Sequence, residues 1–91
     1  MDKIDIREKK TNHGWDFQVT ISGNGNTVHQ VKLSKKYYEK INFGLTPNKL
    51  IRASFKFLLE REPKEMILSK FDLQIIANYF PNYEKEIRKY M

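Results

Sequence analysis

The spacing of apolar residues changes at Ser34, and this change constrains the fold more than any other feature of the sequence. Before Ser34, apolar residues alternate with polar ones, as they do in antiparallel strands that bury one face. Two turns rich in glycine and asparagine, at residues 11–14 and 22–26, divide this part into three segments. We therefore expect a three-stranded antiparallel meander over residues 1–33, with one polar face in solvent and one apolar face under helices.

After Ser34, apolar residues recur at helical spacing. Ser34 is a good N-cap for a short helix that Gly44 can end. Thr46, a capping residue, and a first-turn proline then predict a longer helix over residues 48–61. Apolar residues cover about 200° of this helix, more than the stripe of an ordinary surface helix. We expect it to be the central helix, with Pro63 stopping it.

Beyond the central helix, nine apolar residues crowd into positions 66–80. Because Ser69 and Asp72 interrupt this run, we expect two short helices rather than one, with Asp72 as the N-cap of the second and Pro81 ending it. Residues 82–90 have apolar side chains at helical spacing and predict a final helix, which either docks or frays. The expected fold class is therefore α+β, an N-terminal three-stranded antiparallel meander packed against four to five short C-terminal helices.

The length and composition of the chain limit what it can be. Ninety-one residues leave room for one hydrophobic core, so we expect a single domain over 1–91, with the meander at 1–33 and a helical part at 34–91. A core of this size gives modest stability, and a homodimer stays among the expected states. The chain has no cysteine, no apolar run resembling a signal peptide and no stretch that could span a membrane. We predict a cytoplasmic protein without a membrane partner.

The excess positive charge of the chain is confined to one stretch. The formal net charge is +6, and residues 1–31 and 57–91 are each neutral. Residues 32–56 hold seven cations and a single acid, Glu39. Five of the cations fall on the polar sides of the two expected helices and are the candidate anion- or nucleic-acid-binding residues: Lys36, Lys40, Lys49, Arg52 and Lys56.

A patch of this kind attracts phosphates through counterion release, which gives affinity without sequence specificity. If the two helices pack as a hairpin, all five cations can face one partner. Tyr37 and Tyr38 add aromatic rings beside these cations, and an exposed ring there would suit a base or a protein surface. The alternative is a solvated face that keeps a small protein soluble.

No motif in the sequence indicates catalysis or metal binding. His13 and His29 have no acidic or sulfur partner at metal-ligand spacing, so we expect structural roles for both. The glycine-rich turn at residues 22–26 joins two strands, whereas a phosphate-binding loop opens a helix. Ser34 and Ser54 have no activating base nearby, and no pair of carboxylates stands out. We predict a protein that is not an enzyme and has no catalytic residues, metal ligands or cofactor.

Several short motifs cover roughly residues 27–84 of the chain. They are Thr46-Pro47, the run from Ser54 to Pro63, Ile67-Leu68, Phe71-Asp72-Leu73 and Tyr79-Phe80-Pro81. This pattern resembles an uncharacterised family of short prokaryotic proteins, which has a smaller residue at the position of Met66. The family has no assigned activity, so the resemblance implies a single domain and transfers no site residues.

The order of elements over residues 27–61 gives a second resemblance. Strand, short helix, turn and longer helix follow one another, with Val31-Lys32-Leu33-Ser34 in the strand and Leu50-Ile51-Arg52 in the longer helix. This order is similar to that of ribbon-helix-helix repressors, in which a ribbon made by two chains enters the DNA major groove. The chain departs from that pattern because its first helix is shorter and two strands precede the ribbon. Val31 is expected to pair with the strand from Trp15.

Two classes of function therefore stay open. The first is a small basic binding module that contacts the phosphates of DNA or RNA, motivated by the confinement of the excess charge. The second is a protein-protein interaction or regulatory module, including an inhibitor or antitoxin-like protein. It is motivated by the edge strand expected at Lys3–Lys10 and by the aromatic content of 13%. The residues do not choose between DNA, RNA and a protein partner.

Overall fold

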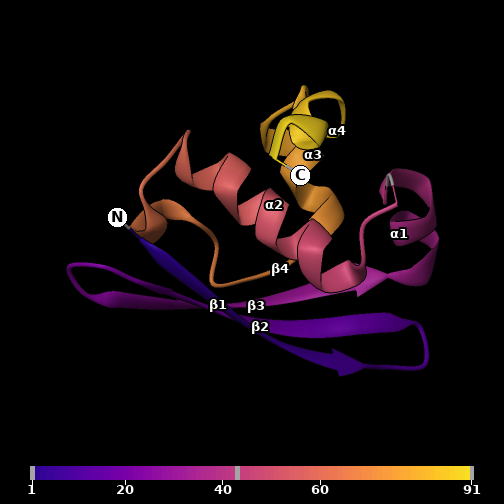
Figure 1. Ribbon diagram of the computed structural model, residues 1–91, viewed down its shortest axis with the longest axis horizontal. Helices are drawn as coiled ribbons and strands as arrows, with labels where there is room; N and C mark the ends of the chain where they lie inside the picture. The colour runs from indigo at the N-terminus through magenta and orange to yellow at the C-terminus, as the bar shows by residue number, and fades with distance from the viewer. Residues whose placement is uncertain (1, 43, 91) are drawn as a thin grey trace.

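A single sheet forms one layer of the protein, and helices form the other (Figure 1). The computed structural model describes residues 2–42 and 44–90. The sheet has the order β1-β2-β3-β4, with strands at Lys3–Lys10, Gly14–Ser22, Asn26–Ser34 and Lys70–Asp72. The first three strands are antiparallel, which confirms the predicted meander, and β4 adds a short parallel strand beside β3.

The two central strands pair as their alternation predicts. Phe17 on β2 lies opposite Val31 on β3, so Val31 does pair with the strand from Trp15. The turn between these strands places Gly23, Asn24 and Gly25 at positive φ, as a tight hairpin turn requires. The register that results sends alternate side chains of both strands into one core.

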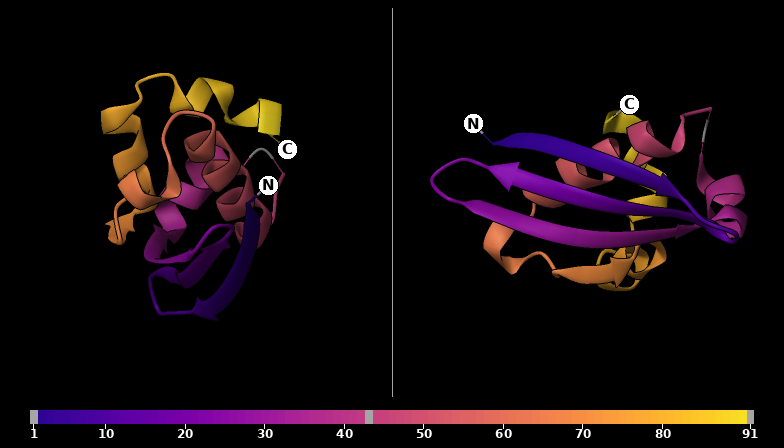
Figure 2. Two further views of the ribbon diagram at one scale, coloured as in Figure 1. Left: turned by 90° about the vertical axis from the view of Figure 1, so that its left-hand side faces the viewer. Right: turned by 90° about the horizontal axis from the view of Figure 1, so that it is seen from below.

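The other face of the sheet is not covered by helices (Figure 2, right). Gln18, Gln30 and Lys32 are exposed there, and this confirms the predicted solvent face. The two edges of the sheet differ in length, because β1 has eight residues and β4 has three. The longer edge is rich in charged side chains, which discourages pairing with further strands.

Both predicted helix starts are confirmed. α1 (Lys35–Ile41) begins after Ser34, whose hydroxyl accepts a hydrogen bond from the Tyr37 amide at 3.1 Å. α2 (Pro47–Leu59) begins after Thr46, whose hydroxyl accepts from the Lys49 amide at 3.3 Å. Such caps satisfy amide groups that have no partner within the helix.

α2 ends before the predicted boundary at residue 61. The amides of Arg61 and Glu62 both bond to the carbonyl of Leu58, at 2.9 Å each, and the chain turns there. The turn brings Pro63 back toward the sheet, where it precedes the 3₁₀ helix η1 (Lys64–Met66). The proline therefore follows the end of α2 at a distance of four residues.

Residues 66–72 are where the sequence prediction was wrong. We expected a helix, but after η1 the chain extends into β4, followed by the 3₁₀ helix η2 (Leu73–Ile75) and α3 (Ile76–Tyr79). The Gln30 amide on β3 bonds to the Ser69 carbonyl at 2.7 Å, so the sheet takes this backbone in place of a helix. Asp72 holds the N-cap position of η2 but makes no capping hydrogen bond through its side chain.

The core lies between the sheet and α2, with the C-terminal helices packed on the other side of α2 (Figure 2, left). Leu50, Phe55 and Phe57 on α2 are fully buried, which confirms its central place. The C-terminal segment forms α4 (Tyr83–Glu86) and the 3₁₀ helix η3 (Ile87–Tyr90). Tyr83 and Ile87 are fully buried, so this segment docks on the core.

Candidate functional site

The five predicted cations lie on two helices that do not form a hairpin. Lys36 and Lys40 are on α1, which packs against β2 and β3 at one end of the sheet (Figure 1). Lys49, Arg52 and Lys56 are on α2, which crosses the sheet. The side-by-side packing of α1 and α2 that would gather all five cations is therefore absent.

Two of these cations are already engaged within the protein. The Lys40 ammonium lies 3.8 Å from a carboxylate oxygen of Glu84, and the Arg52 guanidinium donates to the Ile4 carbonyl at 3.0 Å. Arg52 thus ties α2 to the edge strand β1. The other three, Lys36, Lys49 and Lys56, are exposed and make no ion pair or side-chain hydrogen bond with any residue the structure describes.

We call Lys49, Arg52 and Lys56 the basic strip, because they share the outward side of α2. Neither tyrosine beside the α1 cations offers an exposed ring. Tyr37 is only 8% exposed and donates to a Glu84 carboxylate oxygen at 2.7 Å. Tyr38 packs edge-on against Trp15 with 5.0 Å between ring centroids. The phosphate-binding candidates therefore lack a stacking platform on α1.

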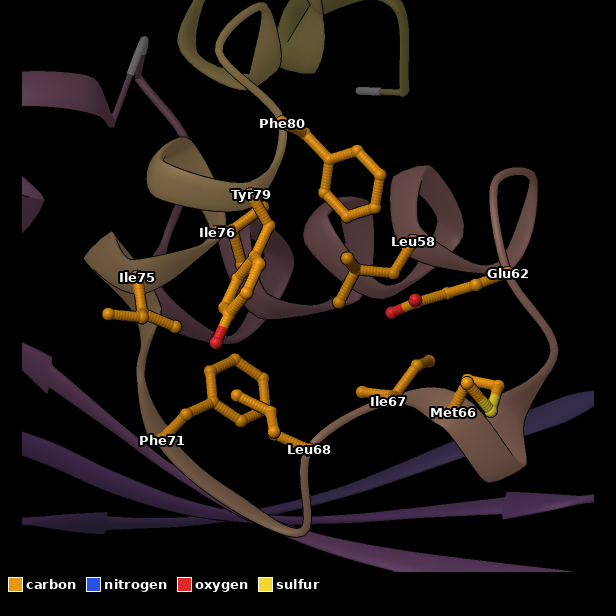
Figure 3. A pocket seen from close by; sticks show the side chains of 10 residues that line it. All are labelled: Leu58, Glu62, Met66, Ile67, Leu68, Phe71, Ile75, Ile76, Tyr79 and Phe80. Carbon is orange, nitrogen blue, oxygen red and sulfur yellow. The ribbon is translucent and has the colours of Figure 1, made fainter.

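An apolar groove of about 260 Å³ opens between the C-terminal end of α2 and residues 66–80 (Figure 3). Its floor consists of buried side chains from α2, the segment before β4, β4 itself and α3. These floor residues are Leu58, Ile67, Phe71 and Ile76. None of the four was predicted from the sequence as a site residue.

The rim of the groove exposes three large apolar side chains. Met66 is 67% exposed, Tyr79 is 64% exposed and Leu68 is 45% exposed. Only one other large apolar residue in the described part of the chain, Val28, is comparably exposed. Apolar exposure is thus concentrated on one surface, which is the usual mark of an interaction site.

Glu62 is the one charged residue among those that line the groove in the described structure. Its carboxylate points into the groove between Leu58 and Ile67 (Figure 3). Partial burial raises the pKa of Glu62 above its usual range, since apolar surroundings disfavour the ionised form. No residue that the structure describes forms an ion pair or side-chain hydrogen bond with it.

His29 holds one side of the groove in place. Its Nδ1 donates to the carbonyl of Leu68 at 2.8 Å, and its Nε2 lies 2.9 Å from the Thr27 hydroxyl. The ring is buried and lies 5.5 Å, centroid to centroid, from Phe55. His29 therefore has the structural role expected from the sequence, and it fixes the backbone that carries a rim residue.

A second, more polar hollow of about 310 Å³ lies at the opposite end of the sheet. His13, Asp16, Lys32 and Asp72 are among the residues that line it. No group of three or more His, Asp or Glu residues in the described chain is placed to hold a metal ion.

Comparison of the chain with protein-family models, curated proteins and solved structures gives no match. The resemblances stated from the sequence therefore stay predictions. Among the described residues, no helix has both the length and the apolar character needed to cross a membrane.

The groove had one signal in the sequence. Positions 66–80 hold nine apolar residues, more than a segment of this length at the surface of a small domain usually buries. Met66, Leu68 and Tyr79 are the members of this run that the core does not bury. An excess of apolar residues in one short segment was thus the available indication of an exposed apolar site.

Proposed function

We propose that this protein is a protein-interaction module that binds an apolar side chain of its partner in the groove. The observation that supports this proposal is the clustering of three of the four exposed large apolar residues on the groove rim. Partners anchor in such places because a large side chain can be removed from water in a preformed hollow. Met66 also suits this purpose, since its flexible side chain adapts to different contacts.

The size of the groove suits a single anchoring side chain. The groove of about 260 Å³ lies at the lower end of the range of small-molecule sites, about 300–1,000 Å³, and it can hold one large side chain. Complete burial of the three rim side chains would contribute about 3–5 kcal/mol, given how much of each is already exposed. Association costs offset much of this gain, so we expect the groove to be the centre of a transient interface.

Site-specific photo-crosslinking in cells tests the proposal. A photoreactive phenylalanine analogue replaces Tyr79 on the rim, and the matched control carries the same analogue at Val28, the exposed apolar residue outside the groove. We expect a discrete protein adduct from position 79 that is absent from position 28. A second change, Met66→Lys, should abolish the adduct. An adduct of equal yield from both positions, or one that survives Met66→Lys, would refute a partner in the groove.

The basic strip supports a second candidate, contact with nucleic-acid phosphates. Lys49 and Lys56 are exposed on the outward side of α2 and have no ion-pair partner in the described structure. Lys36 is equally available on α1, while Lys40 would first have to leave Glu84. We infer non-specific binding, because phosphate contacts carry no sequence information directly.

Fluorescence anisotropy with labelled single- and double-stranded oligonucleotides, over a range of salt, tests this candidate. The double variant Lys49→Glu/Lys56→Glu should weaken binding and reduce the salt slope by about 2, since each phosphate contact contributes about 0.9. Arg52 is left in place because it bonds to Ile4. The control Lys70→Glu/Lys85→Glu changes the net charge equally. An equal loss of oligonucleotide affinity in both double variants would show that only the net charge matters, and it would refute a role for the strip.

A further inference from the structure

We propose that the partner segment bound in the groove carries a lysine or arginine beside its apolar anchor, and that Glu62 binds this cation. The inference rests on the proposed function, because it specifies the chemistry of the same site. It follows from the position of Glu62, from the way the neighbouring cations are used, and from the apolar groove around the carboxylate.

The charge of Glu62 is not compensated by the protein. The carboxylate is directed into the groove, toward Leu58 and Ile67 (Figure 3). Its partial burial already disfavours ionisation, as the raised pKa shows. Such surroundings favour the ionised carboxylate less than water does, and an approaching cation would offset this effect. The groove therefore presents one unmatched charge in otherwise apolar surroundings.

Arg61, the cation next to Glu62 in sequence, is committed elsewhere. Its guanidinium lies 3.4 Å from a carboxylate oxygen of Glu86 and 3.6 Å from the centroid of the Phe57 ring. It also donates to the Phe57 carbonyl and to the Tyr90 hydroxyl, at 3.0 Å each. These contacts hold Arg61 against Phe57, α4 and η3.

Lys64, the other nearby cation, is 7% exposed and is also committed. Its ammonium lies 3.3 Å from a carboxylate oxygen of Glu65 and 3.9 Å from one of Asp2. It donates to the Gly23 carbonyl in the β2–β3 turn as well. Moving Lys64 toward Glu62 would break its hydrogen bond to the Gly23 carbonyl and both ion pairs, so Lys64 is not available to Glu62. In the part of the chain that the structure describes, both cations next to Glu62 are therefore engaged elsewhere, and we infer that a cation for Glu62 comes from the partner.

The apolar floor makes the contact selective. Electrostatic attraction is stronger where water is partly excluded, and repulsion of an anion grows for the same reason. An acidic anchor would be rejected by the groove although the protein as a whole carries a net charge of +6. At about 0.15 M salt the distant charges are screened beyond about 8 Å, so the local carboxylate sets the preference.

Two small probes that differ in the sign of their charge test the inference. Phenylethylammonium and 3-phenylpropionate each join an aromatic anchor to a charged group, and their binding can be followed by chemical-shift titration of the ¹⁵N-labelled protein. We expect phenylethylammonium to shift the groove resonances and to bind about fivefold more tightly than 3-phenylpropionate, as for a partly exposed ion pair. Glu62→Gln should abolish the difference.

The control variant is Glu65→Gln, which removes a neighbouring carboxylate that is paired with Lys64 and does not line the groove. It should leave the preference for the ammonium probe intact. Equal binding of the two probes, no binding of either, or a preference that survives Glu62→Gln would overturn the inference. The two proposals fail separately. Ammonium preference without a crosslinked partner would refute the proposed function and leave Glu62 as a cation site without a partner segment, whereas a crosslinked partner without charge preference would refute the inference alone.

Discussion

The hydrogen bond between Ser54 on α2 and Tyr83 on α4 provides a quantitative test of how the groove is held together. Both residues are fully buried, and their hydroxyl oxygens lie 2.6 Å apart. The Ser54 hydroxyl donates to the Leu50 carbonyl at 2.7 Å, so the Tyr83 hydroxyl must be the donor to Ser54. This bond fixes α4 on α2, and with it the preceding helix α3, which contributes floor and rim residues to the groove.

The direction of the bond sets the expected costs. Tyr83→Phe removes one buried hydrogen bond and should lower the free energy of unfolding by about 1 kcal/mol. For a chain of this length that corresponds to a fall in Tm of about 4–8 °C. Ser54→Ala leaves the Tyr83 hydroxyl buried without an acceptor, at a cost of about 1–3 kcal/mol, and regains about 0.5 kcal/mol of helix propensity.

The double variant Ser54→Ala/Tyr83→Phe leaves no unpaired hydroxyl. Its total cost should fall short of the sum of the single variants by about 1 kcal/mol. Urea unfolding followed by circular dichroism measures all three variants. The control is Tyr79→Phe, the same change at a tyrosine that is 64% exposed, which should cost less than about 0.5 kcal/mol. Additive costs, or a Tyr83→Phe variant as stable as the control, would refute the assigned bond.

Three further predictions concern single positions. Burial raises the pKa of Glu62, so Glu62 contributes most to the stability of the fold below its unfolded pKa of about 4.3, and this contribution declines as pH rises through the folded pKa. Glu62→Gln should therefore raise Tm near neutral pH. In acid, the Tm values of the variant and of the unmodified protein should converge. His29→Phe deletes the bond to the Leu68 carbonyl; it should cost about 1–3 kcal/mol and weaken phenylethylammonium binding in the same titration. Gly14→Ala places a Cβ 2.0 Å from the Leu33 carbonyl oxygen at a φ of +155°, and a loss of more than about 2 kcal/mol in urea unfolding is expected.

The local patterns in the sequence predicted the parts of the fold that local interactions decide. The meander follows from alternation and from turn residues that accept positive φ, as at Asn24. The starts of α1 and α2 follow from the hydroxyls of Ser34 and Thr46, each of which bonds an amide three residues ahead. In each case the residues that determine the structure lie within a few positions of one another.

The parts that could not be predicted depend on contacts between distant residues. The segment from Ile67 to Asp72 has enough apolar residues for a helix, but His29 and Gln30 on β3 hold its carbonyls in an extended chain. Likewise α1 and α2 form no hairpin, because Tyr37 and Ile41 bury their side chains in the common core beside the sheet. The periodicity of apolar side chains predicts neither the pairing of residues 67–72 with the sheet nor the relative packing of α1 and α2.

The two candidate surfaces are physically independent because α2 separates them. Lys56 on the basic strip and Leu58 on the groove floor are two residues apart, which places their side chains about 200° apart around the helix. A partner anchored in the groove therefore leaves the strip open to solvent. The strip consists of cations, whereas Glu62 is the charged residue that lines the groove in the described structure, so the local charges of the two surfaces have opposite sign. The two proposals therefore predict that phosphates favour the strip over the groove, and that a segment with a cation beside an apolar anchor favours the groove.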